Sequence, residues 1–311
     1  MVHDAHAHVH VFGRDFSLRL AEYYLGLYGS AKSWMTGRPW TAEDWCVPSE
    51  KLLEHMDAAG VDRLTIMAFA SVPLESYDPT MGDYIAELCR QHPGRFVGMY
   101  SADPLGGETE AERLRRAVVE LGLTGLKLLP TYSGAAINDR RIWPLYAAAA
   151  ELDVAVVVHT GWSVYPGGRT LAHDHPLQLE DVLADFPSLR AVVAHCGFAW
   201  SEHVLMLLAA HPSLGADFAW WGASQPPWRA AQTLSMAKYL DVAERLVWGT
   251  DYPFTSLEDD LAYWRQVPAV AERMGLEPTV TDKDVESFLG LNVTNFLGLG
   301  DLVGSSVPAT R

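Results

Sequence analysis

Three histidines at alternate positions near the N-terminus could bind a metal ion. They lie in the run Asp4-Ala5-His6-Ala7-His8-Val9-His10. Because alternate residues of a strand project to the same face, two neighbouring imidazoles of this run could hold one ion. The alternation leaves two pairs open, His6 with His8 or His8 with His10. A polar strand end that binds no metal is the other interpretation of the motif.

Three further residues with metal-binding or acid-base side chains follow short apolar runs. His159 closes the run 154–158, His195 closes the run 191–194, and Asp251 closes the run 246–250. Each residue alone is explained as a hydrogen-bonded polar group at the end of a strand. Barrel enzymes build their active sites from the C-terminal ends of several parallel strands, so the residues together predict one site.

The combined set of imidazoles and one carboxylate suits a single divalent transition metal ion. Zinc is the ion that these ligand types favour, with manganese, iron and cobalt as alternatives. A position would remain open for water or for a small-molecule substrate. The residues therefore predict a metal-dependent enzyme.

The elements that must position these side chains alternate between short apolar strands and longer helical patterns. The expected strands cover residues 3–9, 62–69, 95–101, 124–129, 154–159, 190–195, 214–218 and 245–250. Eight strands alternating with helices predict an α/β fold, a (β/α)₈ TIM barrel formed as a single domain by residues 1–300. An open, doubly wound sheet is the alternative, because periodicity does not show closure. Residues 301–311 form an expected flexible tail.

The segment 11–48 is too long for an ordinary connection between a strand and a helix, and it is rich in aromatic residues. Long loops that follow barrel strands usually lie over the active site. We expect a lid or a wall of the pocket here. A structural or oligomer-contact role is the alternative.

Composition excludes several classes of partner. The formal net charge of −16 over 311 residues would repel nucleic acid and anionic membranes. The three cysteines have no CxxC spacing, so neither a disulfide framework nor a thiolate zinc site is indicated. Neither a secretory signal nor a membrane-spanning run is recognisable, which predicts a cytoplasmic location.

The ordered motifs resemble those of the amidohydrolase superfamily. They are 4–8 (DAHAH), 125–128 (GLKL), 159–161 (HTG), 194–197 (AHCG) and 249–253 (GTDYP). The chain is most similar to the amidohydrolase-related branch that includes aminocarboxymuconate-semialdehyde decarboxylase. The resemblance extends from His6 to about Leu299.

This resemblance implies roles for the candidate residues. It selects His6 and His8 over His10 as metal ligands and adds His159 and Asp251. It makes His195 a catalytic residue beside the metal and gives Asp251 a second role as a proton shuttle. It also implies a homo-oligomer, in particular a dimer.

Hydrolysis with a metal-activated water is the predicted reaction. Decarboxylases of the branch often carry proline after the histidine of strand five, whereas here Thr160 and Gly161 follow His159, as in many predicted hydrolases. Those hydrolases often carry histidine where this chain has Leu129. Non-oxidative decarboxylation is the closest alternative. A catalytically silent metal-binding scaffold is a third, although such a scaffold needs neither His195 nor an open coordination position.

Lys127 has two interpretations. A carboxylated lysine could bridge two metal ions, as in other branches of the superfamily, and His195 would then be a ligand of the second ion. A structural or substrate-contacting lysine is the commoner role.

Residues in the loops of the later strands are candidates for substrate contact. Aromatic residues after the later strand ends predict a pocket for a flat apolar or aromatic group, although tryptophans are as often core residues. They are Trp162, Tyr165, Trp200, Trp220, Trp221 and Trp228. Arg169 and Arg229 could hold a substrate carboxylate with paired hydrogen bonds. Surface arginines without a ligand are the alternative.

Overall fold

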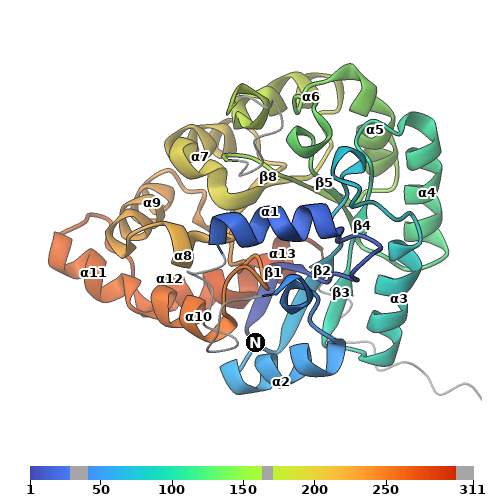
Figure 1. Ribbon diagram of the computed structural model, residues 1–311. Coiled ribbons are helices and arrows are strands. Elements are labelled where there is room, and N and C mark those ends of the chain that lie inside the picture. The colour runs from blue at the N-terminus through green and yellow to red at the C-terminus, as the bar shows by residue number, and fades with distance from the viewer. Residues whose placement is uncertain (29–40, 163–170, 299–311) are drawn as a thin grey trace, which may run out of the picture.

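The computed structural model describes residues 1–28, 41–162 and 171–298 (Figure 1). Its strands are short, buried and rich in β-branched residues. They are β1 (His3–His8), β2 (Arg63–Met67), β3 (Phe96–Gly98), β4 (Tyr100–Ser101), β5 (Gly125–Leu128), β6 (Ala155–Val158), β7 (Ala191–Val193), β8 (Leu214–Asp217) and β9 (Leu246–Val247). Each of the eight expected strands is present, and the expected strand 95–101 is divided at Met99 into β3 and β4.

The strands are parallel and pair in chain order, β1-β2-β3 and then β4 to β9. Backbone hydrogen bonds join the last strand to the first. The Ala5 amide donates to the Trp248 carbonyl at 2.8 Å, and the Asp251 amide donates to the His6 carbonyl at 2.8 Å. The sheet is therefore closed, and the predicted TIM barrel is confirmed over the open sheet.

Helices surround the strands (Figure 1). They are α1 (Leu18–Tyr28), α2 (Ser49–Ala59), α3 (Met81–Gln91), α4 (Gly107–Val119), α5 (Trp143–Glu151), α6 (Leu179–Asp185), α7 (Ser201–Ala210), α8 (Trp221–Ser224), α9 (Pro227–Tyr239), α10 (Leu257–Arg265), α11 (Val267–Met274), α12 (Asp282–Glu286) and α13 (Asn292–Phe296). In the described residues, no helix combines the length and the apolar character that a membrane span requires.

The core has an outer and an inner part, as the alternation of strand side chains requires. On β6, Val156 and Val158 pack in the large cluster with the helices. Ala155 and Val157 belong to a second cluster that fills the interior of the barrel. His159 continues the inner series at the C-terminal end of this strand.

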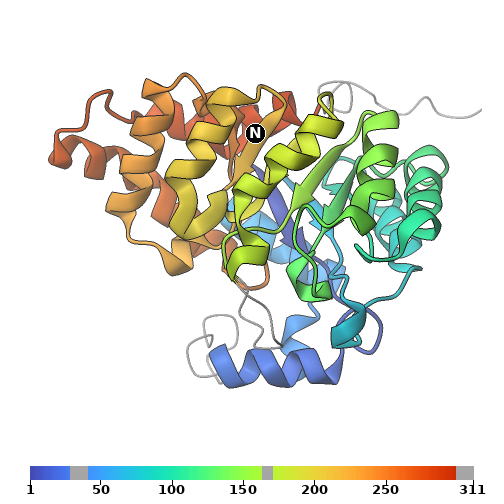
Figure 2. The same ribbon diagram turned by 90° about the horizontal axis from the view of Figure 1, so that it is seen from above.

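The segment after β1 packs at the C-terminal end of the barrel strands. Figure 2 shows α1 lying across that end, apart from the ring of helices. Phe16, Tyr24 and Trp45 of this segment form one buried cluster with Phe69 and Phe254, two residues that follow barrel strands. The role of 11–48 as a lid or a wall of the pocket stays a prediction. Residues 29–40 of the segment and the tail 301–311 lie outside the described residues.

Candidate active site

An irregularity in β1 directs two histidines into the barrel. The pairing of β1 with β2 slips between Asp4 and Ala7. Ala5 packs in the inner cluster, yet both His6 and His8 line the pocket at the C-terminal end of the barrel. A bulge changes the direction of the side chains that follow it, so simple alternation does not hold across this strand.

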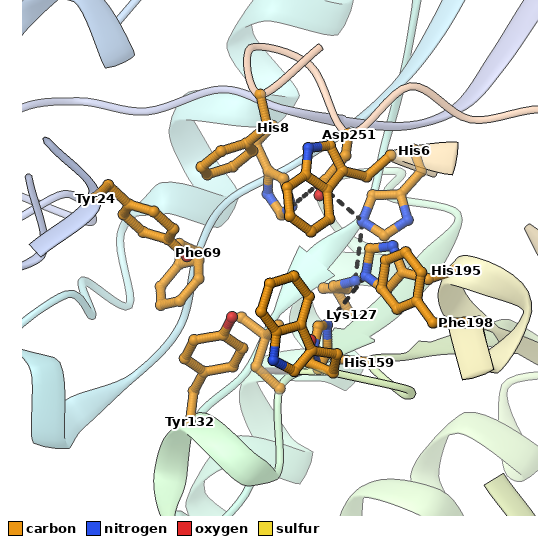
Figure 3. A pocket seen from close by; sticks show the side chains of 14 residues that line it. His6, His8, Tyr24, Phe69, Lys127, Tyr132, His159, His195, Phe198 and Asp251 are labelled. Carbon is orange, nitrogen blue, oxygen red and sulfur yellow. Dashed lines mark hydrogen bonds and ion pairs between the residues drawn. The ribbon is translucent and has the colours of Figure 1, made fainter. Parts of the chain in front are cut away.

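His6, His8 and Asp251 form a compact group of possible metal ligands. One ligand atom from each lies within 4.8 Å of the others. The Oδ1 atom of Asp251 is 3.2 Å from His8 Nε2 and 3.8 Å from His6 Nε2 (Figure 3). An ion about 2.0–2.2 Å from each ligand requires separations of this size, so the residues present fit a divalent ion.

His10 has a structural role instead. Its Nδ1 atom is 3.3 Å from a carboxylate oxygen of Asp15. The same carboxylate accepts hydrogen bonds from the backbone amides of Val11 and Phe69. This arrangement anchors the segment that follows β1, and it removes His10 from the choice of metal ligands that the alternation left open.

Asp4 links the two parts of the ligand group. Its carboxylate accepts hydrogen bonds from the backbone amides of His6, at 2.9 Å, and of Thr250, at 3.1 Å. The Thr250 hydroxyl donates to the same carboxylate. The strand that carries His6 is thereby tied to the loop that carries Asp251, a residue with a positive φ of 63°.

His159 and His195 lie beside this group. His159 Nδ1 and His195 Nε2 are 3.1 Å apart, and the ring of His195 lies 5.3 Å from that of His6. The other ring nitrogen of His195, Nδ1, is 3.0 Å from the Ala219 carbonyl. A carbonyl only accepts hydrogen bonds, so Nδ1 of His195 carries the proton. Nε2 then has the lone pair, and it faces Nδ1 of His159.

Burial keeps the imidazoles neutral. It lowers the pKa of His8 to about 3 and that of His195 to about 4, and it lowers the pKa of His159 well below the usual value. Burial alone would raise the pKa of Asp251. The hydrogen bond from His8 and the neighbouring His6 and His195 outweigh that effect, so its pKa lies well below the usual range. Neutral imidazoles beside a carboxylate are the forms that bind metals.

Lys127 lies at the base of the pocket on β5. Its Nζ atom is 3.0 Å from His6 Nε2, and burial lowers its pKa to about 8. An ammonium group only donates hydrogen bonds, so His6 Nε2 accepts here.

Aromatic side chains form most of the remaining wall. The pocket is open to solvent, and its empty space, the open part included, is about 470 Å³. Trp162 stacks on Trp220, with ring centroids 5.6 Å apart and an angle of 21° between the rings. The other members of the wall are Leu129 and Phe254, with Tyr24, Phe69, Tyr132 and Phe198, which are labelled in Figure 3. A flat apolar group of a substrate would fit between such surfaces.

The residues predicted for substrate contact have different positions. Trp162 lines the pocket. Trp221 is fully buried, and its Nε1 donates to the His195 carbonyl at 2.7 Å, so it supports the site from behind. Trp200 packs against the ring of His175 outside the pocket.

Of the two predicted arginines, Arg229 is among the described residues, and it does not line the pocket. Arg229 lines a separate surface groove, and its guanidinium donates to the Phe198 carbonyl at 2.9 Å and to Gln225 at 3.1 Å. These bonds hold the loop after β7. Arg169 lies outside the described residues.

The residues predicted from the sequence do not include Asp217, which takes part in the site. Asp217 ends β8 and is bonded to His6, as described below. It closes an apolar strand in the way that His159 and His195 do, so the same signal was available. Of the two adjacent tryptophans that the sequence suggests, Trp220 lines the pocket and Trp221 does not; the backbone of Trp220 is left-handed, with φ of 64°.

The family can now be stated. Residues 3–299 match the model of the family described as Amidohydrolase. The chain belongs to this family and is an enzyme of the amidohydrolase superfamily.

The chain is similar to two curated proteins with named activities. The chain is 24% identical over 246 residues to 2-amino-3-carboxymuconate-6-semialdehyde decarboxylase of Dictyostelium discoideum, a match that covers 70% of this chain and 66% of the relative. It is 32% identical over 136 residues to 2-keto-4-carboxy-3-hexenedioate hydratase of Sphingobium sp., covering 38% of this chain and 40% of that protein. The chain thus spans less than two thirds of either relative.

Solved structures support the fold. The structure of an uncharacterised TIM-barrel protein from Bordetella bronchiseptica matches with a TM-score of 0.70 at 20% identity, covering 96% of this chain and all of that one. A dihydroxybenzoic acid decarboxylase from Polaromonas sp. JS666, with bound manganese and an inhibitor, matches with a TM-score of 0.66 at 15% identity, covering 98% and 99%. The barrel architecture is common to all three.

Proposed function

We propose that this enzyme is a divalent-metal-dependent, non-oxidative decarboxylase of a small planar carboxylic acid. The observation that carries the proposal is the grouping of His6, His8 and Asp251 at the base of a pocket with aromatic walls. Decarboxylation was the alternative to hydrolysis in the sequence analysis, and the relatives favour it: further curated matches at 24% and 25% identity are also decarboxylases.

The motif that favoured hydrolysis has a packing explanation. The hydroxyl of Thr160 donates to the Ala194 carbonyl at 2.6 Å and so ties the ends of β6 and β7 together. Gly161 has φ of 94°, and a Cβ atom there would lie 2.7 Å from the Phe198 ring and 2.8 Å from the backbone of Gly197. Both residues are explained without an attacking water.

His6, His8 and Asp251 would hold the ion, and His159 is the proposed fourth ligand. When bound, the ion polarises a substrate oxygen and draws electron density from the bond that breaks. We propose that the bound ion is zinc, because imidazole and carboxylate ligands favour it. The manganese in the Polaromonas decarboxylase makes manganese the first alternative.

The chain's own groups supply positioning and proton transfer. In the reaction, the bond between the carboxylate carbon and its neighbour breaks, carbon dioxide leaves, and the electron pair remains on the neighbouring carbon. That carbon then takes a proton. The proton comes from solvent, and we assign its relay to His195. Nδ1 of this ring is engaged by Ala219, so the lone pair of Nε2 can take up a solvent proton and pass it to the carbon. The aromatic walls hold the planar substrate and keep water away.

Turnover in deuterium oxide tests this proposal. Metal-loaded enzyme is incubated with a panel of hydroxybenzoates and unsaturated carboxylic acids, and carbon dioxide is measured together with the product's NMR spectrum. We expect one carbon dioxide per turnover and one deuterium at the carbon that lost its carboxylate. Incorporation of ¹⁸O from labelled water without carbon dioxide release would instead establish hydrolysis or hydration.

Substitution of Trp162 by alanine is expected to raise KM by roughly 3- to 10-fold, since an aromatic contact contributes about 0.5–1.5 kcal/mol. The metal content and kcat should change little. Trp228 is the matched control, because it is about as exposed as Trp162, 51% against 45%, and lines the separate surface groove. Equal KM values for Trp162→Ala and Trp228→Ala would exclude the Trp162 wall from substrate binding.

A further inference from the structure

Asp217 contacts both His6 and His195 of the candidate site. It ends β8, and its side chain is fully buried. One oxygen, Oδ2, is 2.9 Å from His6 Nδ1. The other, Oδ1, accepts hydrogen bonds from the backbone amides of His195, at 2.8 Å, and Ala219, at 3.0 Å. A proposed metal ligand and the proposed proton-transfer residue are thus held by one carboxylate.

The contact with His6 decides which nitrogen of the imidazole carries the proton. Lys127 Nζ, 3.0 Å from His6 Nε2, donates to that atom. Nε2 therefore presents a lone pair, and Nδ1 carries the proton that it donates to Asp217. Nε2 is also the atom that lies 3.8 Å from the Asp251 carboxylate. Asp217 thus selects the form of His6 in which the nitrogen facing the ligand group can bind a metal.

The contact with His195 holds an unfavourable backbone. His195 and Cys196 have positive φ values of 59° and 43°. Non-glycine residues in this region cost of the order of 1 kcal/mol or more each and persist only where the surroundings hold them. The end of β8 and the residues after it hold His195 by three hydrogen bonds. Asp217 accepts from its amide, Ala219 accepts from its ring, and Trp221 donates to its carbonyl.

We propose that Asp217 is a positioning residue that sets the tautomer of His6 and the backbone of His195 together. The proposal rests on the proposed function only in that it takes His6 as a metal ligand. Asp217 itself does not line the pocket. It acts through the two histidines and not on the substrate.

Only a carboxylate satisfies this position. Asp217 accepts from one ring nitrogen and two backbone amides. An asparagine has one accepting oxygen and one donating NH₂ group. If its oxygen faced the backbone amides, the NH₂ group would donate to His6 Nδ1 and move the ring proton to Nε2. In the flipped orientation, the NH₂ group would face two N–H donors.

The experiment compares the wild-type protein with Asp217→Asn and Asp217→Ala. Metal affinity is measured by competition with a chromophoric chelator for zinc and for manganese. We expect both variants to lose affinity by about 10- to 100-fold, the usual effect of removing a carboxylate behind a histidine ligand. Asp260→Asn is the control: this carboxylate is equally buried, accepts from Trp248 and Trp264, and lies outside the pocket. It should retain native affinity.

A second measurement does not depend on how the Asp217 variants fold. ¹⁵N spectra of histidine-labelled, metal-free wild-type protein report the tautomer of His6, with the signals assigned by their loss in His6→Gln. We expect the proton on Nδ1, and a proton on Nε2 would overturn the proposal. So would native metal affinity in folded Asp217→Asn, even if its melting temperature fell, because the role would then be structural only. A wild-type protein that binds metal but releases no carbon dioxide would contradict the proposed reaction and leave this result standing.

Discussion

Simultaneous replacement of His6 and His8 by alanine is expected to abolish metal binding. The two imidazoles supply both nitrogens of the compact ligand group, and Asp251 would remain as its only member. The loss of an ion that contributes several kcal/mol to the transition state should lower the rate by at least about 10²- to 10³-fold. Metal analysis of protein purified without added metal, with carbon dioxide assays on the same samples, measures both effects. The wild-type protein should contain about one ion per chain.

His10→Ala is the matched control for this double variant. His10 belongs to the same alternating run, and its ring stacks on that of His8 at 5.4 Å, but its hydrogen bond goes to Asp15. It should retain the ion, measured per folded protein after gel filtration. Loss of the ion in His10→Ala, together with its retention in the single variant His6→Ala, would restore the His8/His10 pair. Two ions per wild-type chain would instead favour the carboxylated form of Lys127.

The barrel was predictable because its strands are short, apolar and regularly spaced. The ends of the strands were predictable for the same reason. The residues predicted there, His159, His195 and Asp251, all line one pocket. The choice between His6 and His10 was not predictable from alternation, since the bulge after Asp4 and the Asp15 carboxylate decide it. The bulge is a local irregularity of the strand, and the contact with Asp15 is made outside the strand. The periodicity of the sequence predicts neither feature.

Substrate contacts were harder to predict because they depend on loop conformation. Trp220 and Trp221 are adjacent, and a left-handed backbone at Trp220 puts the first in the pocket and the second behind His195. Arg229 is engaged by a backbone carbonyl that sequence spacing cannot reveal. Asp217 differs from these loop residues, because it lies at the end of a strand. A polar residue at a strand end is the same signal that identified His159 and His195. Its partners come from β1 and β7, and only the closed barrel brings them together.

Replacement of His195 by alanine is expected to lower kcat by about 10²- to 10⁴-fold, the range typical of a positioned acid-base group. His195 is not a member of the compact ligand group, and its Nε2 faces His159. The variant should therefore keep most of its metal, and KM should change less than kcat. Metal analysis and steady-state kinetics on the same preparation separate these effects.

Two variants sharpen the test of His195. His195→Asn keeps an amide that can donate to the Ala219 carbonyl but cannot relay a proton, so it should be as inactive as the alanine variant. His211→Ala is the control, because this histidine follows α7 and lies outside the pocket. If metal and activity disappeared together in His195→Ala, His195 would be a ligand, and the site would hold the ion through the pair His159 and His195, whose facing nitrogens are 3.1 Å apart. If His195→Asn retained native kcat, the imidazole would be a structural support for the loop after β7, and proton transfer would have to be assigned to Asp251.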